Sequence, residues 1–527
     1  MTQAIVETSA GCIRGRQRKG TVSFKGVPYA APLQGRRRFL PPEAVKPWTG
    51  VRDASRNGSA APQVALPVFS WINAAAGKLG EDCLSLNVWT PAADTKRRPV
   101  LVWIHGGGFL VGSGSTAVYA GSDLARRGDV VVVTVNYRLG ALGYAHLGTV
   151  LGAGFESCTN LGVRDQIAAL EWVQGNIERF GGDPGNVTVF GQSAGAMSVG
   201  ALLAAPRARA LFHRAICMSG AAEHVIDRET AQHVASEFLR ELGGPPTSHE
   251  MLARISTRRI LQAQHATMTR MADLRTLMIF LPMVDGEVIP EAPLAQIRRG
   301  ATARIPILTG STLEEWKLFR MLDAPLGRFA WEDLVERMDS VLPQAFPQAP
   351  NAATAALRWR EALGSRSAAR SPAEIWSAFQ TARIFHLPSA RLAEAQREGG
   401  GDAWSYLFTW RPALRRSLGA FHALDIPFVF GSTGHPLARP LTGLGKRASE
   451  LGDVMQDAWI QFAHRGTPSH GRLPEWPRYC EDARRTMVFG REVALAHAPL
   501  DAERRLLERW SAPPIAAAAR VPVAASL

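Results

Sequence analysis

One serine of this chain lies at the centre of a small-residue turn that could make it a nucleophile. Residues 189–196 read Val-Phe-Gly-Gln-Ser-Ala-Gly-Ala, which places Ser193 between Gly191 and Gly195. A serine hydroxyl attacks an acyl carbon when a base removes its proton, and a sharp Gly-x-Ser-x-Gly turn exposes that hydroxyl. The pattern alone is a weak signal, because the chain holds 49 glycines.

The segments around Ser193 favour the nucleophile over an ordinary turn. Residues 186–190 are a β-branched run typical of a strand, and they follow the turn signal Gly-Gly-Asp-Pro at 181–184. Residues 194–205 are small and compatible with a helix. The order strand, tight turn, helix predicts that side chains at Gly191 and Gly195 would collide with the neighbouring strand and helix.

Acyl transfer also needs donors for the negative charge that develops on the carbonyl oxygen. After an apolar run at 100–104 the chain reads His-Gly-Gly-Gly-Phe, with Gly106, Gly107 and Gly108 in succession. Three glycines alone could form a plain flexible turn. Together with a Gly-x-Ser-x-Gly turn, they favour a loop whose bare N–H groups bind the oxyanion.

A base and an acid that orients it are expected downstream of the serine, with the acid first and the histidine after it. Residues 309–315 follow a strand-like run at 305–308 and end in Glu314 and Glu315, and His422 follows another run at 404–408. Adjacent residues leaving a strand point to different sides, so only one glutamate can reach His422. Counting from the strand does not choose between them. Other histidines are expected on the surface or at helix caps, although chain order alone does not exclude them: His213, His224, His265, His464 and His470.

The elements that must position these groups alternate between strands and helices. Short continuous apolar runs, as in buried parallel strands, occur at 100–104, 130–135, 187–190, 215–218, 305–308, 404–408 and 487–489. Residues 165–180 carry apolar positions at helical spacing. The pattern predicts an α/β fold with a large, mostly parallel sheet covered by helices on both faces.

We expect one domain over residues 1–527. Residues 311–382 are mostly helical in pattern and predict an insertion beside the sheet. Residues 511–527 form an Ala/Pro-rich tail that is expected to fray.

Composition excludes several other classes of protein. The net charge of +14 comes from dispersed arginines without a nucleic-acid-binding module, so solvated surface charge is expected, with an anionic substrate or an acidic surface as the alternative. The N-terminus lacks the basic and apolar regions of a secretory signal, and no apolar stretch is long enough to span a membrane. Five scattered cysteines without ligand spacing predict reduced thiols, no metal site and a cytoplasmic protein: Cys12, Cys83, Cys158, Cys217 and Cys480.

These features and others resemble the type-B carboxylesterases, which have the α/β-hydrolase fold and include bacterial p-nitrobenzyl esterases, animal carboxylesterases and cholinesterases. The resemblance runs from about residue 5 to residue 510 through nine motifs in order: Phe24-Lys-Gly-Val-Pro-Tyr-Ala30, Glu81-Asp-Cys-Leu-Ser-Leu-Asn87, Trp103-Ile-His-Gly-Gly-Gly-Phe109, Val135-Asn-Tyr-Arg-Leu-Gly140, Asn160-Leu-Gly-Val-Arg-Asp-Gln166, Phe180-Gly-Gly-Asp-Pro184, Phe190-Gly-Gln-Ser-Ala-Gly-Ala196, Pro282-Met-Val-Asp-Gly286 and Gly419-Ala-Phe-His-Ala-Leu-Asp-Ile-Pro-Phe428.

The resemblance implies a role for each candidate residue. Ser193 is implied as the nucleophile, His422 as the base and Glu315 as the acid, since the family pattern Gly-x-x-x-Asp-Glu aligns Glu315 with the catalytic carboxylate. The N–H groups of Gly107, Gly108 and Ala194 are implied as the oxyanion hole. Helical insertions around an active-site gorge are implied as well, and no cofactor is expected.

Three departures from the family pattern carry information. Ala61 stands where secreted members have the cysteine that pairs with Cys83, which agrees with a reducing compartment. Gln192 replaces the glutamate of cholinesterases, which removes one reason to expect a quaternary ammonium substrate. Trp316 replaces the usual glycine after the acid and is expected to narrow the gorge.

The expected function is hydrolysis of small to medium carboxylic esters through an acyl-enzyme. Alternatives on the same residues are hydrolysis of aryl carbamates or amides, or of polyanionic esters. A non-catalytic binding module is disfavoured because all three triad side chains are present. The expected partner is a small ester, with no nucleic acid or membrane; monomer and homodimer both stay open.

Overall fold

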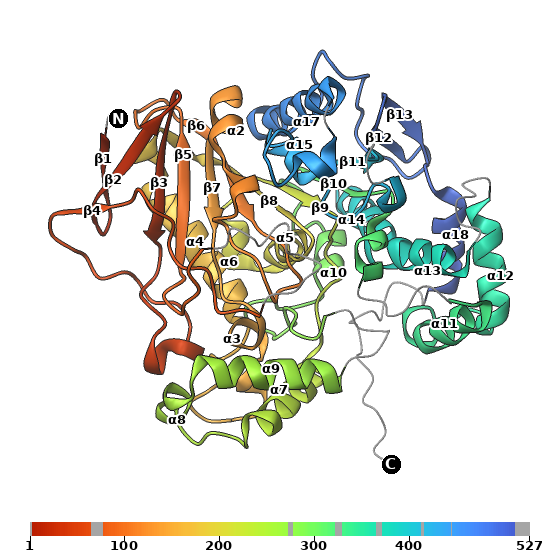
Figure 1. Cartoon of the computed structure of the whole chain (residues 1–527), viewed down its shortest axis with the longest axis horizontal. Helices are drawn as coiled ribbons and strands as arrows, with labels where there is room; N and C mark the ends of the chain where they lie inside the picture. Colours follow the sequence, from red (N-terminus) through yellow and green to blue (C-terminus); the bar gives the residue numbers. More distant parts are fainter. Residues whose placement is uncertain are drawn as a thin grey trace.

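The computed structural model describes residues 3–64, 77–271, 278–321, 329–364, 371–412, 416–443 and 445–511. Within these ranges, thirteen strands form one sheet that crosses the molecule (Figure 1). The strand order is β1-β2-β3-β5-β7-β6-β8-β9-β10-β11-β12-β13, with β4 beside β2. The predicted α/β class is therefore confirmed.

The centre of the sheet is parallel and its two ends are antiparallel. All neighbours from β7 to β12 pair in parallel, while β1, β2, β3, β5 and β7 pair antiparallel in turn, as do β12 and β13. The strands are β1 Gln3–Thr8, β2 Gly11–Arg18, β3 Thr21–Pro28, β4 Val51–Asp53, β5 Ser85–Thr90, β6 Arg98–Ile104, β7 Val131–Val135, β8 Gly182–Gln192, β9 Arg214–Met218, β10 Ile307–Thr312, β11 Ala403–Phe408, β12 Arg485–Phe489 and β13 Val493–His497.

Every apolar run that the sequence predicts to be a parallel strand is one. Strands β6 and β7 are buried along their whole length, as expected for strands covered on both faces. The expected turn at 181–184 is shorter than predicted: Gly181 has a positive φ of 76°, and β8 already begins at Gly182. Strand β10 extends to Thr312, and the first helical turn after it is Glu315–Lys317.

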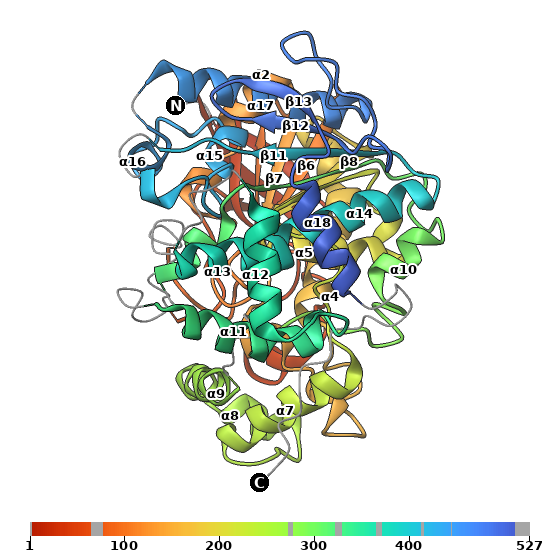
Figure 2. The ribbon, with the colours of Figure 1, turned by 90° about the vertical axis from the view of Figure 1, so that its right-hand side faces the viewer.

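Helices cover both faces of the sheet (Figures 1 and 2). Helices α4, α5 and α14 pack on one face, and α2 and α17 pack on the other. The helices are α2 Ser122–Gly128, α3 Gly140–Tyr144, α4 Leu161–Asn176, α5 Ala194–Ala204, α6 Pro206–Arg209, α7 Arg228–Leu242, α8 His249–Arg254, α9 Thr257–Arg270, α10 Pro293–Arg298, α11 Trp331–Ala345, α12 Ala352–Leu363, α13 Pro372–Thr381, α14 Leu387–Glu398, α15 Ile426–Val429, α16 Arg439–Thr442, α17 Lys446–Arg465 and α18 Asp501–Trp510.

Helices α11, α12 and α13 form a layer beside the sheet with a hydrophobic core of its own. This core includes Trp359, Trp376 and Phe379, and α18 closes it with Leu507 and Trp510. Figure 2 shows α18 lying against α12. Of the tail expected at 511–527, only Ser511 falls within the described residues.

A buried ion pair joins the parallel sheet to the first long helix. The Arg138 guanidinium donates from Nε and Nη2 to the Asp165 carboxylate at 2.7 and 2.6 Å, and the Arg138 backbone N–H donates to the same carboxylate at 3.0 Å. Both side chains are almost fully buried. Because removing one partner would leave the other charge buried and unpaired, the loss would cost about 3–5 kcal/mol.

Candidate active site

Ser193 occupies a strained junction between β8 and α5. Strand β8 ends at Gln192 and helix α5 begins at Ala194, and Ser193 between them has φ 57° and ψ −129°. A non-glycine residue at positive φ costs on the order of 1–3 kcal/mol, so the surroundings must hold it there. The Ser193 N–H donates to the Met218 carbonyl at 2.9 Å, and the Ser193 carbonyl accepts from the Met197 N–H at 2.9 Å.

The two glycines around Ser193 are required by close backbone contacts. A Cβ at Gly191 would lie 2.4 Å from the carbonyl carbon of Gly195, and a Cβ at Gly195 would lie 2.0 Å from the Ile104 carbonyl oxygen. The first contact is with helix α5 and the second with the end of strand β6. The structure therefore confirms the collisions predicted at both positions.

His422 and Glu315 form a buried pair after the ends of their strands. His422 Nδ1 lies 2.6 Å from Glu315 Oε2, and the two side chains are 1% and 0% exposed. The Thr312 N–H donates to the other carboxylate oxygen at 2.7 Å. A carboxylate can only accept, so the neutral imidazole carries its proton on Nδ1 and a lone pair on Nε2.

Glu314 points away from His422. Its carboxylate pairs with Lys317 Nζ at 2.6 Å and Arg411 Nε at 2.9 Å, and it accepts the Ala420 N–H at 2.8 Å. Burial raises the pKa of Glu314, but these three partners outweigh that effect and hold its pKa below the usual value. The choice that the sequence left open between two adjacent glutamates is thus resolved in geometry, with Glu315 at the histidine.

Gln192 contacts the free edge of the imidazole. Its Nε2 lies 3.2 Å from His422 Nε2 and can donate to the lone pair there. The hydrogen bonds of the described residues include none between Ser193 Oγ and His422. Gln192, the residue just before Ser193, therefore occupies the free edge of the imidazole.

Aromatic rings surround the imidazole of His422. The ring centroids of Phe319 and Phe385 lie 5.0 and 4.9 Å from that of His422. Trp316 is buried, its ring centroid lies 5.1 Å from that of Phe319, and its backbone N–H donates to Thr381 Oγ1 at 3.0 Å. Trp316 therefore supports a ring that contacts His422. No sequence pattern indicated Phe319 or Phe385, which come from separate segments.

The glycine loop after β6 presents unused donors beside Ser193. In the described structure, the N–H groups of Gly107, Gly108 and Ala194 donate to no protein acceptor. Gly107 and Gly108 have φ of 120° and 63°, and a Cβ at Gly107 would lie 2.1 Å from the Val111 carbonyl oxygen. A Cβ at Gly106 would lie 3.0 Å from that of Ser193, which places the loop against the serine.

Neutral buried groups hold this loop. His105 stacks on Tyr137 with a centroid separation of 4.6 Å, and the Tyr137 hydroxyl donates to the His105 carbonyl at 2.7 Å. Burial lowers the pKa of His105 to about 4, so its imidazole is neutral at pH 7. The Gly140 N–H donates to the Phe109 carbonyl at 2.6 Å and fixes the far end of the loop.

A second carboxyl group lies behind the His422–Glu315 pair. Asp425 is fully buried, and its Oδ2 accepts from the Tyr406 hydroxyl at 3.0 Å, while Oδ1 has no partner. Burial, together with the negative charge of Glu315, raises the pKa of Asp425 to about 7. The electrostatic field at the pair therefore includes a carboxyl that changes charge near neutral pH.

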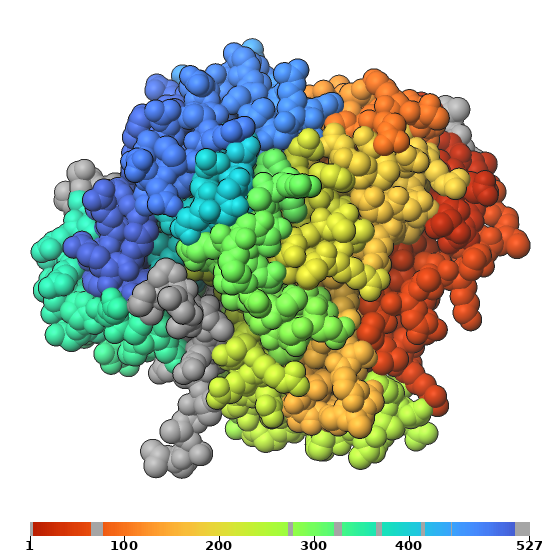
Figure 3. Space-filling model, turned by 180° about the vertical axis from the view of Figure 1, so that it is seen from behind, coloured from red at the N-terminus to blue at the C-terminus, as the bar shows by residue number. Residues whose placement is uncertain are grey.

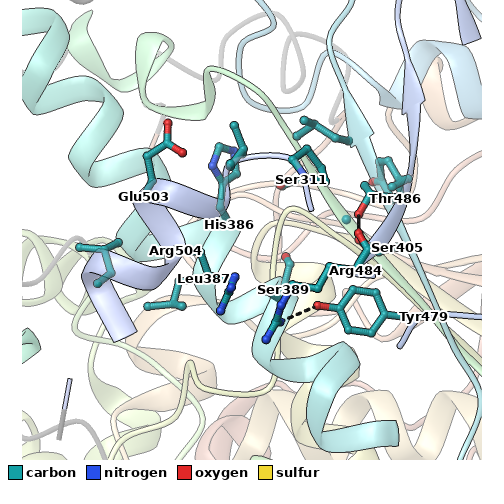
Figure 4. Close-up of a pocket in the computed structure, with 18 residues that line it drawn as sticks. Ser311, His386, Leu387, Ser389, Ser405, Tyr479, Arg484, Thr486, Glu503 and Arg504 are labelled. Carbon is teal, nitrogen blue, oxygen red and sulfur yellow. Dashed lines mark hydrogen bonds between the residues drawn. The ribbon is translucent and has the colours of Figure 1, made fainter. Parts of the chain in front are cut away.

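A cavity of about 70 Å³ lies on the other side of the acid-bearing segment (Figure 4). It is lined by residues of β10, β11, α14 and α18 and of the segment around the start of β12, with Ser311, Ser405 and Arg484 among them. His386 at its wall donates from Nε2 to the Thr312 carbonyl at 2.9 Å. Ser193 and His422 do not line it, and it is far too small for an ester substrate.

Three structural findings bear on other expectations from the sequence. All five cysteines are free, including the buried Cys83. In the described part of the chain, no three His, Cys, Asp or Glu side chains gather as a metal site would require. Among the same residues, no helix is both long and apolar enough to cross a membrane.

Comparisons with known proteins agree with this geometry. Residues 2–505 match the carboxylesterase family. The para-nitrobenzyl esterase of Bacillus subtilis (strain 168) is 36% identical over 519 residues, which cover 96% of this chain and 99% of that protein. The phenmedipham hydrolase of Pseudarthrobacter oxydans is 35% identical over 503 residues, covering 94% and 96% of the two chains.

Solved structures give the same result. The carboxylesterase EST55 of Geobacillus stearothermophilus superposes with a TM-score of 0.83 at 37% identity, over 96% of this chain and all of that one. A thermophilic p-nitrobenzyl (PNB) esterase superposes with a TM-score of 0.85 at 35% identity and the same coverage. The chain therefore belongs to the carboxylesterase family, has the α/β-hydrolase fold, and is a carboxylesterase that hydrolyses carboxylic esters.

Proposed function

We propose that Ser193 is the nucleophile of this esterase, His422 its general base, and Glu315 the acid that orients His422. The N–H groups of Gly107, Gly108 and Ala194 form the oxyanion hole in this proposal. The observation that carries it is the buried His422–Glu315 pair, 2.6 Å apart, whose free imidazole edge contacts the residue just before a strained serine. The unused donors of the glycine loop give the developing charge a place to bind.

The reaction proceeds in two steps through an acyl-enzyme. Ser193 Oγ displaces Gln192 at His422 Nε2, gives its proton to that nitrogen and attacks the ester carbonyl. The oxyanion hole binds the tetrahedral oxygen, and Glu315 stabilises the imidazolium. His422 then protonates the leaving alcohol. A water molecule repeats the sequence on the acyl-enzyme and releases the carboxylic acid.

The proposed substrates are small to medium esters of the p-nitrobenzyl kind, because the para-nitrobenzyl esterase matches this chain over almost its whole length. Carbamates are a second candidate class. The relative named phenmedipham hydrolase, whose name denotes a carbamate substrate, is nearly as similar. The surroundings of the His422–Glu315 pair do not favour polyanionic esters, since the Lys317 and Arg411 cations are both bound to Glu314.

We also propose a cytoplasmic location, supported by the five free thiols. Titration of the denatured, unreduced protein with Ellman's reagent is expected to find all five. Two missing thiols would indicate a disulfide and an exported protein. The choice between monomer and homodimer stays open.

The assignment of the nucleophile is tested with Ser193→Ala. This variant is expected to lose turnover of p-nitrophenyl butyrate and to keep its unfolding temperature. In the parent protein, an organophosphate is expected to label Ser193 alone, as read by peptide mass spectrometry. Stoichiometric labelling of another residue would overturn the proposal. A series of p-nitrophenyl esters beside a phenyl carbamate and a tricarboxylate ester would rank the substrate classes.

A further inference from the structure

A large opening lies at the edge of the sheet where its parallel strands begin. A cavity of about 620 Å³ is lined there by residues from the starts of β9, β10 and β11, the end of α17 and the segment before β12. We call it the arginine cavity. Figure 3 shows the blue, green and yellow parts of the chain that supply these residues meeting on one face.

Four guanidinium groups line the arginine cavity beside one carboxylate. The arginines are Arg214, Arg304, Arg465 and Arg478, and the carboxylate is that of Asp402. Asp402 accepts from Arg478 Nε at 3.1 Å and is shared with Arg397, also at 3.1 Å. The lining therefore carries a formal charge of about +3 with no carboxylate left to neutralise it.

Three of the four arginines have no acidic partner in the described structure. Arg304 and Arg465 are exposed and make no side-chain hydrogen bond or ion pair there, and Arg214 contacts only the Asn186 side-chain oxygen. Gly466 leaves room for the Arg214 guanidinium, since a Cβ at residue 466 would lie 3.2 Å from Arg214 Nε. Arginines such as Arg97, Arg127 and Arg207 elsewhere on the surface are ion-paired.

His213 adds a further donor. Its Nδ1 accepts the Val187 N–H at 3.1 Å, so the neutral ring carries its proton on Nε2. Burial and the neighbouring Arg214 both lower the pKa of His213, which keeps the ring neutral at pH 7. The arginine cavity is thus rich in donors and poor in acceptors.

The arginine cavity is separate from the ester-hydrolysing site. Arg214 begins strand β9, and Met218, which accepts the Ser193 N–H, ends it. A five-residue strand places the two sites about 15 Å apart on opposite edges of the sheet. The charge of the cavity therefore cannot contact an ester bound at Ser193.

Planar guanidinium groups bind phosphate and carboxylate groups through paired hydrogen bonds. The volume lies within the range of about 300–1,000 Å³ that small-molecule sites occupy. Several cations from distant segments repel one another unless an anion lies between them. We propose that the arginine cavity binds a small polyanion with two or more phosphate or carboxylate groups, independently of the reaction at Ser193.

The test uses the intact protein with tripolyphosphate and citrate as separate probes, at an ionic strength held constant with sodium chloride. Calorimetric titration is expected to show one saturable site for at least one probe. Which probe binds more tightly distinguishes a phosphate ligand from a carboxylate ligand. A raised unfolding temperature in the presence of the probe is expected to accompany binding.

Two double variants with the same charge change locate the site. Arg304→Gln/Arg465→Gln removes two cavity arginines, while Arg18→Gln/Arg258→Gln removes two exposed arginines elsewhere that have no described ion pair. The first is expected to weaken binding at least tenfold and the second less than twofold. Both are expected to keep wild-type turnover of p-nitrophenyl butyrate, which shows that each is folded.

Three outcomes would overturn the proposal. Equal weakening in the two double variants would indicate diffuse attraction to a basic protein. Absence of saturable binding for both probes would remove the site. Binding of a short oligonucleotide that depends on Arg304 and Arg465, without binding of either small probe, would assign the cavity to nucleic acid instead.

Discussion

The two edges of the parallel sheet differ in how far their charged side chains are paired. At the edge where the strands end, the Glu315 carboxylate lies 2.6 Å from His422, and Glu314 lies within 3 Å of both Lys317 and Arg411. At the edge where they begin, four arginines line the arginine cavity, and only Arg478 among them is paired with its one aspartate, Asp402. At the first edge Lys317 and Arg411 are both bound to Glu314, and the unused donors are N–H groups of the glycine loop, whereas at the second edge three arginines have no acidic partner in the described structure.

This difference matches what each edge is proposed to bind. An ester is neutral, and negative charge appears on it only in the transition state, so fixed dipoles that wait for that charge are the effective catalysts. A permanent anion is attracted by net charge before any reaction occurs. Paired charges therefore suit an edge that binds a neutral ester, and unpaired cations suit an edge that binds a permanent anion.

The largest expected effect comes from removing the Glu315 carboxylate that lies beside His422. In Glu315→Gln only one oxygen is left for the two donors that Glu315 accepts from, the Thr312 N–H and His422 Nδ1, and the imidazolium loses its counter-charge, so kcat is expected to fall by about 10³–10⁴. Steady-state kinetics with p-nitrophenyl butyrate measures this, and thermal unfolding checks that the variant is folded. Retention of wild-type kcat would refute the role proposed for Glu315.

The next largest effect is expected from the N–H dipoles of the glycine loop rather than from charged side chains. A valine at Gly107 would meet the Val111 carbonyl oxygen, since even a Cβ would lie 2.1 Å from it, and the loop would have to move its N–H groups. We expect Gly107→Val to cost on the order of 3 kcal/mol in transition-state stabilisation, mainly in kcat.

Gly108→Ala is the milder companion of this variant. The nearest atom to its added Cβ would be 3.9 Å away, so space is available, and only the positive φ of 63° opposes it. We expect a loss of stability of about 1 kcal/mol with the loop kept in place. Equal kcat values in Gly107→Val and the parent would contradict the proposed oxyanion hole.

The sequence predicted the strands at the centre of the sheet better than those at its N-terminal end. The parallel strands were predictable because they are covered on both faces and read as continuous apolar runs, as in Val131–Val135. Only Ile13 and Gly15 of β2 are buried, and Val51–Asp53 is wholly exposed, so the N-terminal end of the sheet has no comparable apolar run.

Side-chain neighbours were harder to predict than elements. The choice between Glu314 and Glu315 depends on the turn after Thr312, whose N–H binds the Glu315 carboxylate. Phe385 reaches His422 from a π-helical turn over Ala382–His386, which has no sequence pattern of its own. The arginine cavity brings together Arg214 and Arg478 through strand order, which a list of dispersed arginines does not contain.

A smaller effect is expected from the unpaired carboxyl at the catalytic edge. The pKa of Asp425 rises from the ordinary 3.8 to about 7 on folding, first through burial and then through the charge of Glu315. Between these values the unfolded chain has lost the proton and the folded chain keeps it. The stability that this proton contributes is present below pH 4 and is lost as the pH rises through about 7.

Asp425→Asn cannot ionise and should lack this dependence. Between pH 6 and pH 8, urea unfolding of the parent is expected to lose roughly 1 kcal/mol more than unfolding of the variant. Parallel pH profiles of the two proteins would show that Asp425 does not titrate in this range. The result would sharpen the comparison, because Asp425 is a described carboxyl near His422 that is bound to a neutral hydroxyl and to no cation.

The smallest effect on catalysis is expected from the residue next to the proposed acid. Glu314 is as close to the reaction in sequence as Glu315, but its carboxylate binds Lys317, Arg411 and the Ala420 N–H instead of the imidazole. Glu314→Gln keeps an oxygen that can accept the Ala420 N–H and leaves the His422–Glu315 pair in place. Two cations lose their counter-charge, which at a partly exposed site weakens the loop by about 1 kcal/mol or less. We therefore expect kcat of Glu314→Gln to stay within a few-fold of the parent, several hundredfold above that of Glu315→Gln in the same assay. The reverse ranking would show that the acid is Glu314 and that charge pairing at this edge serves the reaction through the other carboxylate.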